Sequence, residues 1–77
     1  MMEGESGVVR VFQDGEGYIK PDAGGADVYV NWRSCVASWA PRAGDRVKYS
    51  LSDTVDGDAT ARRCWPVWWG IFYTVAG

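Results

Sequence analysis

Short clusters of glycine and aspartate interrupt the chain at close intervals, and they restrict its fold more than any other feature. These clusters read DGEG, PDAGGAD, PRAGD and SDTVDGD, and only short runs rich in valine, tyrosine, phenylalanine and tryptophan lie between them. Glycine and aspartate favour turns, whereas β-branched and aromatic residues favour strands. No segment has helical periodicity over a useful length. The spacing therefore predicts a small all-β sandwich or barrel.

The chain is long enough for one domain at most, because a domain of 77 residues must be compact to fold alone. We expect residues 1–6 to be a flexible N-terminus, residues 7–64 to form a five-stranded antiparallel barrel, and residues 65–77 to form an additional hydrophobic segment. Closure into a barrel avoids long exposed strand edges. The segment Ser34–Ala40 has a poor strand pattern and favours a single helical or 3₁₀ turn. The expected strands are Gly7–Phe12, Gly17–Lys20, Asp27–Trp32, Arg46–Ser52 and Asp58–Cys64.

Alternation along these strands assigns their side chains to two faces. In VYVNW the two valines share one face, while Tyr29 and Asn31 share the other. In GYIK, Tyr18 and Lys20 oppose Ile19. In VVRVF the second and third valines oppose the first valine, the arginine and the phenylalanine. Burial of the valines and Ile19 in a core would leave Tyr18, Tyr29 and Lys20 together on the outside.

Several classes of function are excluded by the residues that are missing. The chain has no histidine, and its two cysteines, Cys35 and Cys64, are far apart without a CxxC motif. Zinc sites that need histidine, and catalysis that pairs Ser or Cys with His, are therefore excluded. We expect no enzyme activity, no cofactor and no metal, and we interpret both cysteines as small buried thiols. The acidic start MMEGESG is unlike a secretory leader, which predicts a cytoplasmic protein; a single disulfide is the alternative in an oxidising compartment.

An ordered series of motifs runs through most of the sequence. GVVRVF is followed by GEGYI, an acidic glycine-rich turn, DVYVNW, the serine Ser34, the loop aromatic Trp39 and finally GDRV. This series resembles the cold-shock domain, a five-stranded oligonucleotide-binding (OB) barrel, over residues 7 to 64. The resemblance implies an OB-type fold and binding of single-stranded RNA or DNA with little sequence preference.

In that family, bases stack on aromatic residues of the two central strands, and basic residues hold the backbone. The resemblance implies that Trp39 lies at the rim of this platform and that Arg10 and Lys20 lie near the nucleic-acid backbone. Of the pair Arg62–Arg63, alternation allows at most one side chain to serve the platform. The residues expected to bind nucleic acid are Arg10, Phe12, Tyr18, Lys20, Tyr29, Asn31, Trp32 and Trp39.

The sequence departs from the family pattern at four places on this surface. Val11 replaces a tryptophan, Glu16 replaces an aromatic residue, Asn31 replaces a histidine, and Asp14 stands where lysine is usual. Each stacked base is worth about 1–3 kcal/mol, so the loss of two aromatic residues costs roughly 2–6 kcal/mol of binding. The net charge of −2 also lowers the affinity for phosphates. The alternative function is therefore an acidic protein-interaction or inhibitor module that uses the same platform or the C-terminal segment.

The C-terminal segment, which together with the preceding Cys64 reads CWPVWWGIFYTVAG, is uncharged and holds three of the five tryptophans. It is too short to span a bilayer, which takes about 20 apolar residues. Three arrangements remain open. The segment extends the fifth strand and folds back over the barrel, it pairs with a second copy through residues 65–76 in a homodimer, or it binds a protein partner.

Overall fold

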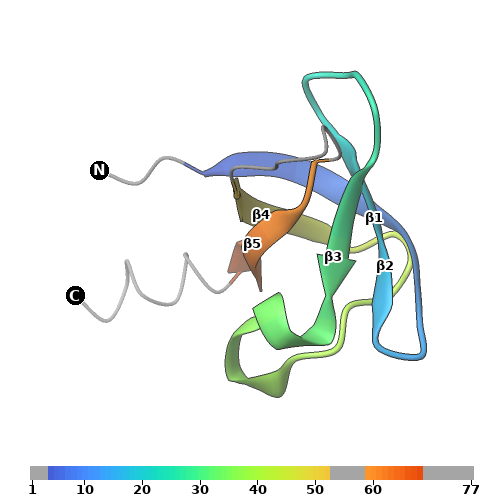
Figure 1. The fold of residues 1–77 in the computed structure, drawn as a ribbon, viewed down its shortest axis with the longest axis vertical. Coiled ribbons are helices and arrows are strands. Elements are labelled where there is room, and N and C mark those ends of the chain that lie inside the picture. Colours follow the sequence, from blue (N-terminus) through green and yellow to red (C-terminus); the bar gives the residue numbers. More distant parts are fainter. Residues whose placement is uncertain (1–3, 53–58, 69–77) are drawn as a thin grey trace.

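The computed structural model describes residues 4–52 and 59–68, which form an all-β fold (Figure 1). Two 3₁₀ turns, η1 (Trp32–Ser34) and η2 (Val36–Ser38), follow the third strand. η2 lies in the segment Ser34–Ala40, where a single turn is expected, whereas η1 begins before it, at a residue expected to end the third strand. The described strands are β1 (Glu5–Gln13), β2 (Glu16–Pro21), β3 (Val28–Asn31), β4 (Arg46–Leu51) and β5 (Ala61–Pro66).

Both ends of the predicted barrel, residues 7–64, differ from the observed strands. β1 already begins at Glu5, inside the N-terminus expected to be flexible, because Glu5 and Ser6 pair with β4. β5 continues past Cys64 and ends at Pro66, so two residues of the expected C-terminal segment belong to the sheet. The next two residues have helical backbone. Residues 53–58 and 69–77 lie outside the described residues, and with them most of the C-terminal segment.

The five antiparallel strands curl into a half-barrel with the order β3-β2-β1-β4-β5 (Figure 1). The two edge strands, β3 and β5, approach each other at isolated bridges. Tyr29 pairs with Thr60, and its backbone N–H donates to the Ala59 carbonyl oxygen at 3.0 Å. A second bridge joins Cys35 to Cys64. These bridges bring the surface of β3 next to that of β5, although the two strands are far apart in the sequence.

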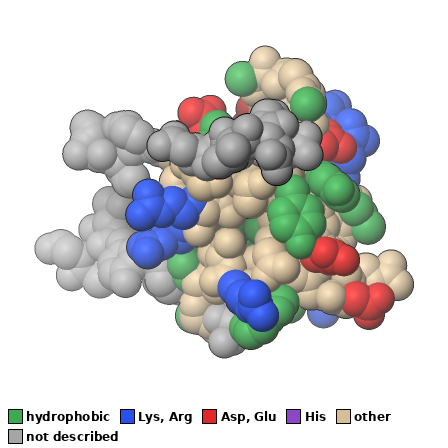
Figure 2. Space-filling model, viewed as in Figure 1, with side chains coloured by type: hydrophobic (Ala, Val, Ile, Leu, Met, Phe, Trp, Pro, Cys, Tyr) green, Lys and Arg blue, Asp and Glu red, His purple; other side chains and the backbone are tan. Residues whose placement is uncertain are grey.

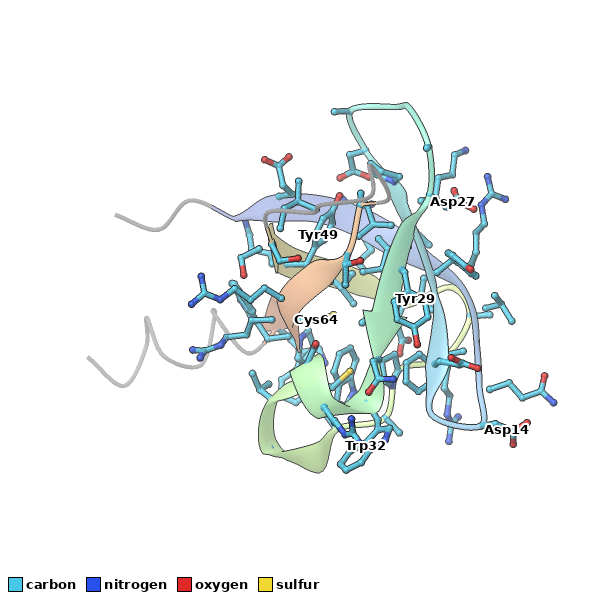
Figure 3. All side chains as sticks on the ribbon, viewed as in Figure 1. Asp14, Asp27, Tyr29, Trp32, Tyr49 and Cys64 are labelled. Atoms are coloured by element: carbon cyan, nitrogen blue, oxygen red, sulfur yellow. The ribbon has the colours of Figure 1, made fainter. Side chains whose placement is uncertain are left out.

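Apolar side chains from every strand fill the inside of the curled sheet. Tyr49 is the largest of these fully buried side chains, at 1 % exposure (Figure 3). Both cysteines are buried free thiols, in agreement with their interpretation from the sequence. The buried hydrophobic residues are Val9, Ile19, Val28, Val30, Cys35, Val47, Tyr49, Ala61 and Cys64.

A β-bulge at Arg10 changes which side chains of β1 face the core. The pairing of β1 with β2 shifts between Val9 and Val11, so Arg10 is the extra residue. Before the bulge Val9 is buried; after it Val11 is 45 % exposed and Phe12 packs against the core. Strict alternation, which placed Val11 inside with Val9 and Phe12 outside, is therefore wrong from position 11 onward.

The bulge brings β1 very close to β2 at Gly17. Phe12, Gly17 and Val30 form one inward-facing row across three strands. A Cβ atom at Gly17 would lie within 1.9 Å of the Val11 carbonyl oxygen and 2.8 Å of the Phe12 Cα. Both neighbours are backbone atoms that cannot rotate away. Glycine at position 17 is therefore required by the approach of the two strands.

The substitution Gly17→Ala tests this contact. We expect overpacking to lower the melting temperature by at least about 8 °C, measured by circular dichroism. Gly4→Ala is the matched control, because its methyl group would lie 3.4 Å from the nearest atom, the Tyr49 carbonyl oxygen. The control should melt within about 3 °C of the wild type. Equal melting temperatures for the two variants would contradict the close approach of β1.

The buried Tyr49 makes stability depend on alkaline pH. Burial raises its pKa, and the negative charges of Glu5 and Asp22 add to the increase. The folded state therefore keeps a proton that the unfolded chain releases above about pH 10, so stability present below that pH is lost as the pH rises.

We expect the free energy of unfolding of Tyr49→Phe to decrease less than that of the wild type between about pH 10 and pH 11. Urea denaturation at several pH values measures this slope. Tyr18→Phe, which removes a hydroxyl group from an exposed ring, should keep the wild-type slope. An unchanged slope in Tyr49→Phe would show that other groups control the alkaline transition.

Candidate nucleic-acid interface

Three aromatic rings lie on the solvent side of β2, β3 and η1, and we call Tyr18, Tyr29 and Trp32 the aromatic surface. Tyr18 is 46 % exposed and Trp32 is 56 % exposed, while Tyr29 is half-buried. Tyr18 and Tyr29 pair across the β2–β3 ladder, with ring centroids 5.8 Å apart and an interplanar angle of 69°. Figure 2 shows hydrophobic side chains over β2 and β3 on this face, and Figure 3 labels Tyr29 and Trp32. The grouping expected from alternation in β2 and β3 is therefore observed.

The turn between β1 and β2 holds Trp32 in place. Its backbone N–H donates to the Gly15 carbonyl oxygen at 2.8 Å. Gly15 has a φ of +83°, and a Cβ atom there would lie 2.9 Å from the Cδ1 of Trp32, so the indole rests against bare backbone. On the ring itself, the guanidinium carbon of Arg33 lies 5.4 Å from the centroid, a cation–π contact.

A chain of hydrogen bonds connects η1 to β2 across the aromatic surface. The backbone N–H of Arg33 donates to Asn31 Oδ1 at 3.0 Å. Asn31 Nδ2 donates to the Tyr29 hydroxyl at 3.2 Å, and this hydroxyl donates to Glu16 Oε1 at 2.7 Å. A backbone N–H can only donate, so it fixes which end of the Asn31 amide faces Arg33. The direction of the whole chain follows, and the chain ends on a carboxylate.

Glu16 lies in the middle of the aromatic surface. It precedes Tyr18 by two residues, so both side chains are on the same side of β2, and it pairs with Asn31 on β3. The residue before it in the chain is Gly15, and the indole of Trp32 packs against this glycine. The side chain of Glu16 is solvent-exposed, and its place in the strand lies between Tyr18 and the turn residue Gly15 that contacts Trp32.

The basic residues expected near the backbone differ in their surroundings. Arg10 forms an ion pair with Asp27 at 2.9 Å, with 52 % of its side chain exposed. This partner offsets the charge of Arg10, which the sequence analysis expects near the nucleic-acid backbone. Lys20 is exposed, and no carboxylate among the described residues forms an ion pair with it.

Arg62 and Arg63 both face the solvent, in contrast to their expected placement on opposite faces of the strand. The pairing of β4 with β5 shifts between Ser50 and Leu51, and Arg62 is the extra residue of this second bulge. In the described part of the chain neither arginine has an ion-pair partner. Figure 2 shows Lys and Arg side chains beside β5 on the same face as the aromatic surface.

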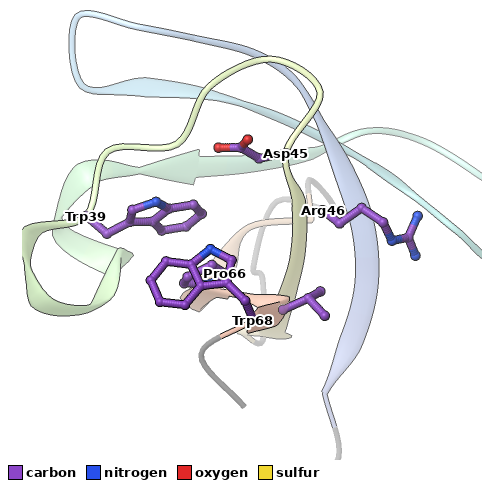
Figure 4. A pocket seen from close by; sticks show the side chains of 6 residues that line it. Trp39, Asp45, Arg46, Pro66 and Trp68 are labelled. Atoms are coloured by element: carbon purple, nitrogen blue, oxygen red, sulfur yellow. The ribbon is translucent and has the colours of Figure 1, made fainter. Parts of the chain in front are cut away.

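Two of the expected binding residues lie elsewhere. Phe12 packs against the core because of the bulge in β1. Trp39 also packs against the core, and it lines a separate pocket of about 250 Å³ with Pro66, Trp68 and their neighbours (Figure 4). None of the residues that line this pocket belongs to the aromatic surface. The structure therefore does not bring Phe12 or Trp39 together with Tyr18, Tyr29 and Trp32.

Sequence reasoning missed the polar part of this surface. Asn31 is among the residues expected to bind nucleic acid and Glu16 is a departure from the family pattern, but the sequence does not predict the hydrogen bonds that join both to Tyr29. The signal was their shared register opposite each other in β2 and β3. The exposure of both Arg62 and Arg63 had no sequence signal, because a bulge depends on the partner strand.

No group of three or more His, Cys, Asp or Glu side chains that could hold a metal ion occurs within residues 4–52 and 59–68. Cys35 and Cys64 face each other at the second bridge. The hydrogen bond between the two thiols lowers the pKa of Cys35 and raises that of Cys64, and burial opposes the ionisation of both. This pair belongs to the core rather than to the aromatic surface.

Neither the comparison with protein-family models nor the search of curated proteins found a match for this chain. Within the described ranges, no helix has the length and apolar character needed to cross a bilayer.

Tyr29→Phe tests the hydrogen-bond chain, because it removes both the donor to Glu16 and the acceptor for Asn31. We expect a loss of about 0.5–1.5 kcal/mol in the free energy of unfolding, measured by urea denaturation. Tyr18→Phe is the control, because among the described residues its hydroxyl has no hydrogen-bond partner. Equal effects of the two substitutions would contradict the role of Tyr29 as the link.

Proposed function

We propose that this chain binds single-stranded RNA or DNA by stacking bases on Tyr18, Tyr29 and Trp32. One observation carries the proposal: exposed aromatic rings lie on the same face of the half-barrel as arginines that have no ion-pair partner among the described residues. Aromatic faces accept any base, and arginine binds phosphates, so the combination suits a single strand.

We also propose that the half-barrel is a divergent OB barrel of the cold-shock type. The order of its five strands, with β1 between β2 and β4 and with bridges from β3 to β5, supports this assignment. The ordered motifs of residues 7 to 64 support it as well. In this proposal the chain is a binding protein and not an enzyme.

The backbone of the strand runs past Arg33, Arg62 and Arg63. η1 and β5 border β3, so these arginines lie on one side of the aromatic surface, while Lys20 extends from β2 on the other. Each phosphate contact with a single strand contributes about 0.7 to the salt slope of binding. Since few such contacts are available and Glu16 repels phosphate, the affinity is weak to moderate and the slope is shallow.

Trp32→Ala tests the stacking role. We expect it to weaken binding of labelled oligo-U and oligo-T by about 5- to 150-fold at low salt, measured by fluorescence anisotropy. Leu51→Ala is the control, because it truncates an exposed apolar residue of β4, which is not a neighbour of β2 or β3. The absence of saturable binding by the wild type at low salt would reject the function, and equal affinities of the two variants would reject the stacking role of Trp32.

Glu16 favours a second candidate, an acidic module that docks on a protein. A carboxylate beside aromatic rings suits an arginine side chain, whose guanidinium forms ion pairs with carboxylates and stacks on rings. The exposed Trp68 beside the pocket of Trp39 and Pro66 adds an apolar surface on which a protein partner could dock. Against this candidate, the arginines beside β5 repel a cationic segment.

A further inference from the structure

We infer that Glu16 reads the base stacked next to it and selects guanine, an inference that rests on the proposed function. The carboxylate lies in the middle of the aromatic surface, at a place where a ring would give more area for stacking. Its role follows from the direction of the hydrogen bonds that end on it.

Every donor in the chain from Arg33 to Glu16 points toward Glu16. The backbone N–H of Arg33 fixes the orientation of the Asn31 amide, and this amide donates to the Tyr29 hydroxyl. The hydroxyl in turn donates its single proton to Glu16 Oε1. The carboxylate at the end has only acceptors. One lone pair of Oε1 is used, so the remaining lone pairs of Oε1 and all those of Oε2 are available to a ligand. The carboxylate itself therefore accepts hydrogen bonds and donates none.

The position of Glu16 places these acceptors at the edge of a stacked base. Side chains two residues apart on one face of a strand are separated by about 7 Å, comparable to the width of a base. A base lying on Tyr18 thus presents its edge to Glu16, and Tyr18 is 46 % exposed and free to receive it. The hydrogen bond from Tyr29 holds the carboxylate at this edge rather than letting it turn into the solvent.

Guanine is the base whose edge matches a pair of acceptors. Its Watson–Crick edge carries two adjacent donors, N1–H and the N2 amino group, which the two carboxylate oxygens accept in parallel. Uracil and thymine flank their single N3–H with two carbonyl oxygens that repel a carboxylate. Adenine and cytosine each place a ring-nitrogen acceptor beside their amino donor. The acceptor-only carboxylate therefore favours guanine over the other four bases.

An arginine-rich peptide has the same donor geometry, but the surroundings favour nucleic acid. Arg33, Arg62 and Arg63 lie on the side of the aromatic surface toward β5, and among the described residues none of them has an ion-pair partner. These cations attract the phosphates on either side of a bound guanosine and repel a basic peptide.

The test uses three labelled RNA heptamers that differ only at the central base: uridine throughout, one guanosine, or one inosine, which lacks the N2 amino group of guanosine. A single guanosine avoids the formation of quadruplexes. We expect the wild-type chain to bind the guanosine heptamer about tenfold more tightly than the all-uridine one, and the inosine heptamer to lose most of this gain. Fluorescence anisotropy at low salt measures all three affinities.

Two variants that each remove one negative charge show whether the preference for guanosine depends on Glu16. Glu16→Gln keeps an acceptor for Tyr29 but replaces one carboxylate oxygen with an amide donor, and it should bind the three heptamers with equal affinity. Asp14→Asn removes a charge from an exposed residue two positions away, outside the hydrogen-bond chain, and should keep the preference for guanosine. Circular dichroism confirms that both variants are folded.

The outcomes separate this inference from the function on which it rests. Equal wild-type affinities for the three heptamers would overturn the guanine inference and leave stacking in place, as would a preference that survives in Glu16→Gln. Binding of none of the heptamers would overturn both proposals. Binding of an arginine-rich peptide, lost in Glu16→Gln and retained in Asp14→Asn, without binding of the heptamers, would assign Glu16 to protein recognition.

Discussion

The close approach of β1 to β2 at Gly17 is the contact on which the surface of this protein depends. The bulge at Arg10 pushes the Val11 carbonyl toward Gly17, and no side chain larger than hydrogen fits there. The same bulge turns Phe12 into the core and Val11 toward water. One extra residue in β1 thus decides that the outer row across the sheet is Val11, Tyr18 and Tyr29, and that this row ends in a small aliphatic group rather than a ring.

The second organising feature is the direction of the hydrogen bonds on that surface. A single backbone N–H, at Arg33, orients Asn31, and through it Tyr29 and Glu16. The tyrosine ring is thereby held between a stacking partner, Tyr18, and a carboxylate. A platform of rings alone would not discriminate between bases. In the function proposed here, position 16 gives up stacking area and supplies hydrogen-bond acceptors in its place, so affinity is exchanged for selectivity.

Much of the fold followed from local patterns. Turns occur at the clusters DGEG, PDAGGAD and PRAGD, as predicted, and the all-β class with five strands is confirmed for the described residues. Alternation in β2 and β3 placed Tyr18 and Tyr29 outside and Ile19, Val28 and Val30 in the core, because both strands pair without interruption. The same reasoning failed in β1 and β5. Each of these strands has a bulge, at which two of its residues oppose one residue of the neighbouring strand, and alternation within one strand does not reveal this mismatch.

By itself, then, the sequence determined the class of the fold, the identity of most core residues and the two tyrosines of the outer surface, because turn propensity and two-residue periodicity are local properties. Only the tertiary structure decided that Phe12 packs against the core, that Trp39 belongs to a pocket with Pro66, and that Arg62 and Arg63 are both exposed. The chain of hydrogen bonds that ends on Glu16 was decided at the same level. All of these depend on how strands distant in the sequence meet, and pairing of this kind leaves no periodic signal in a single strand.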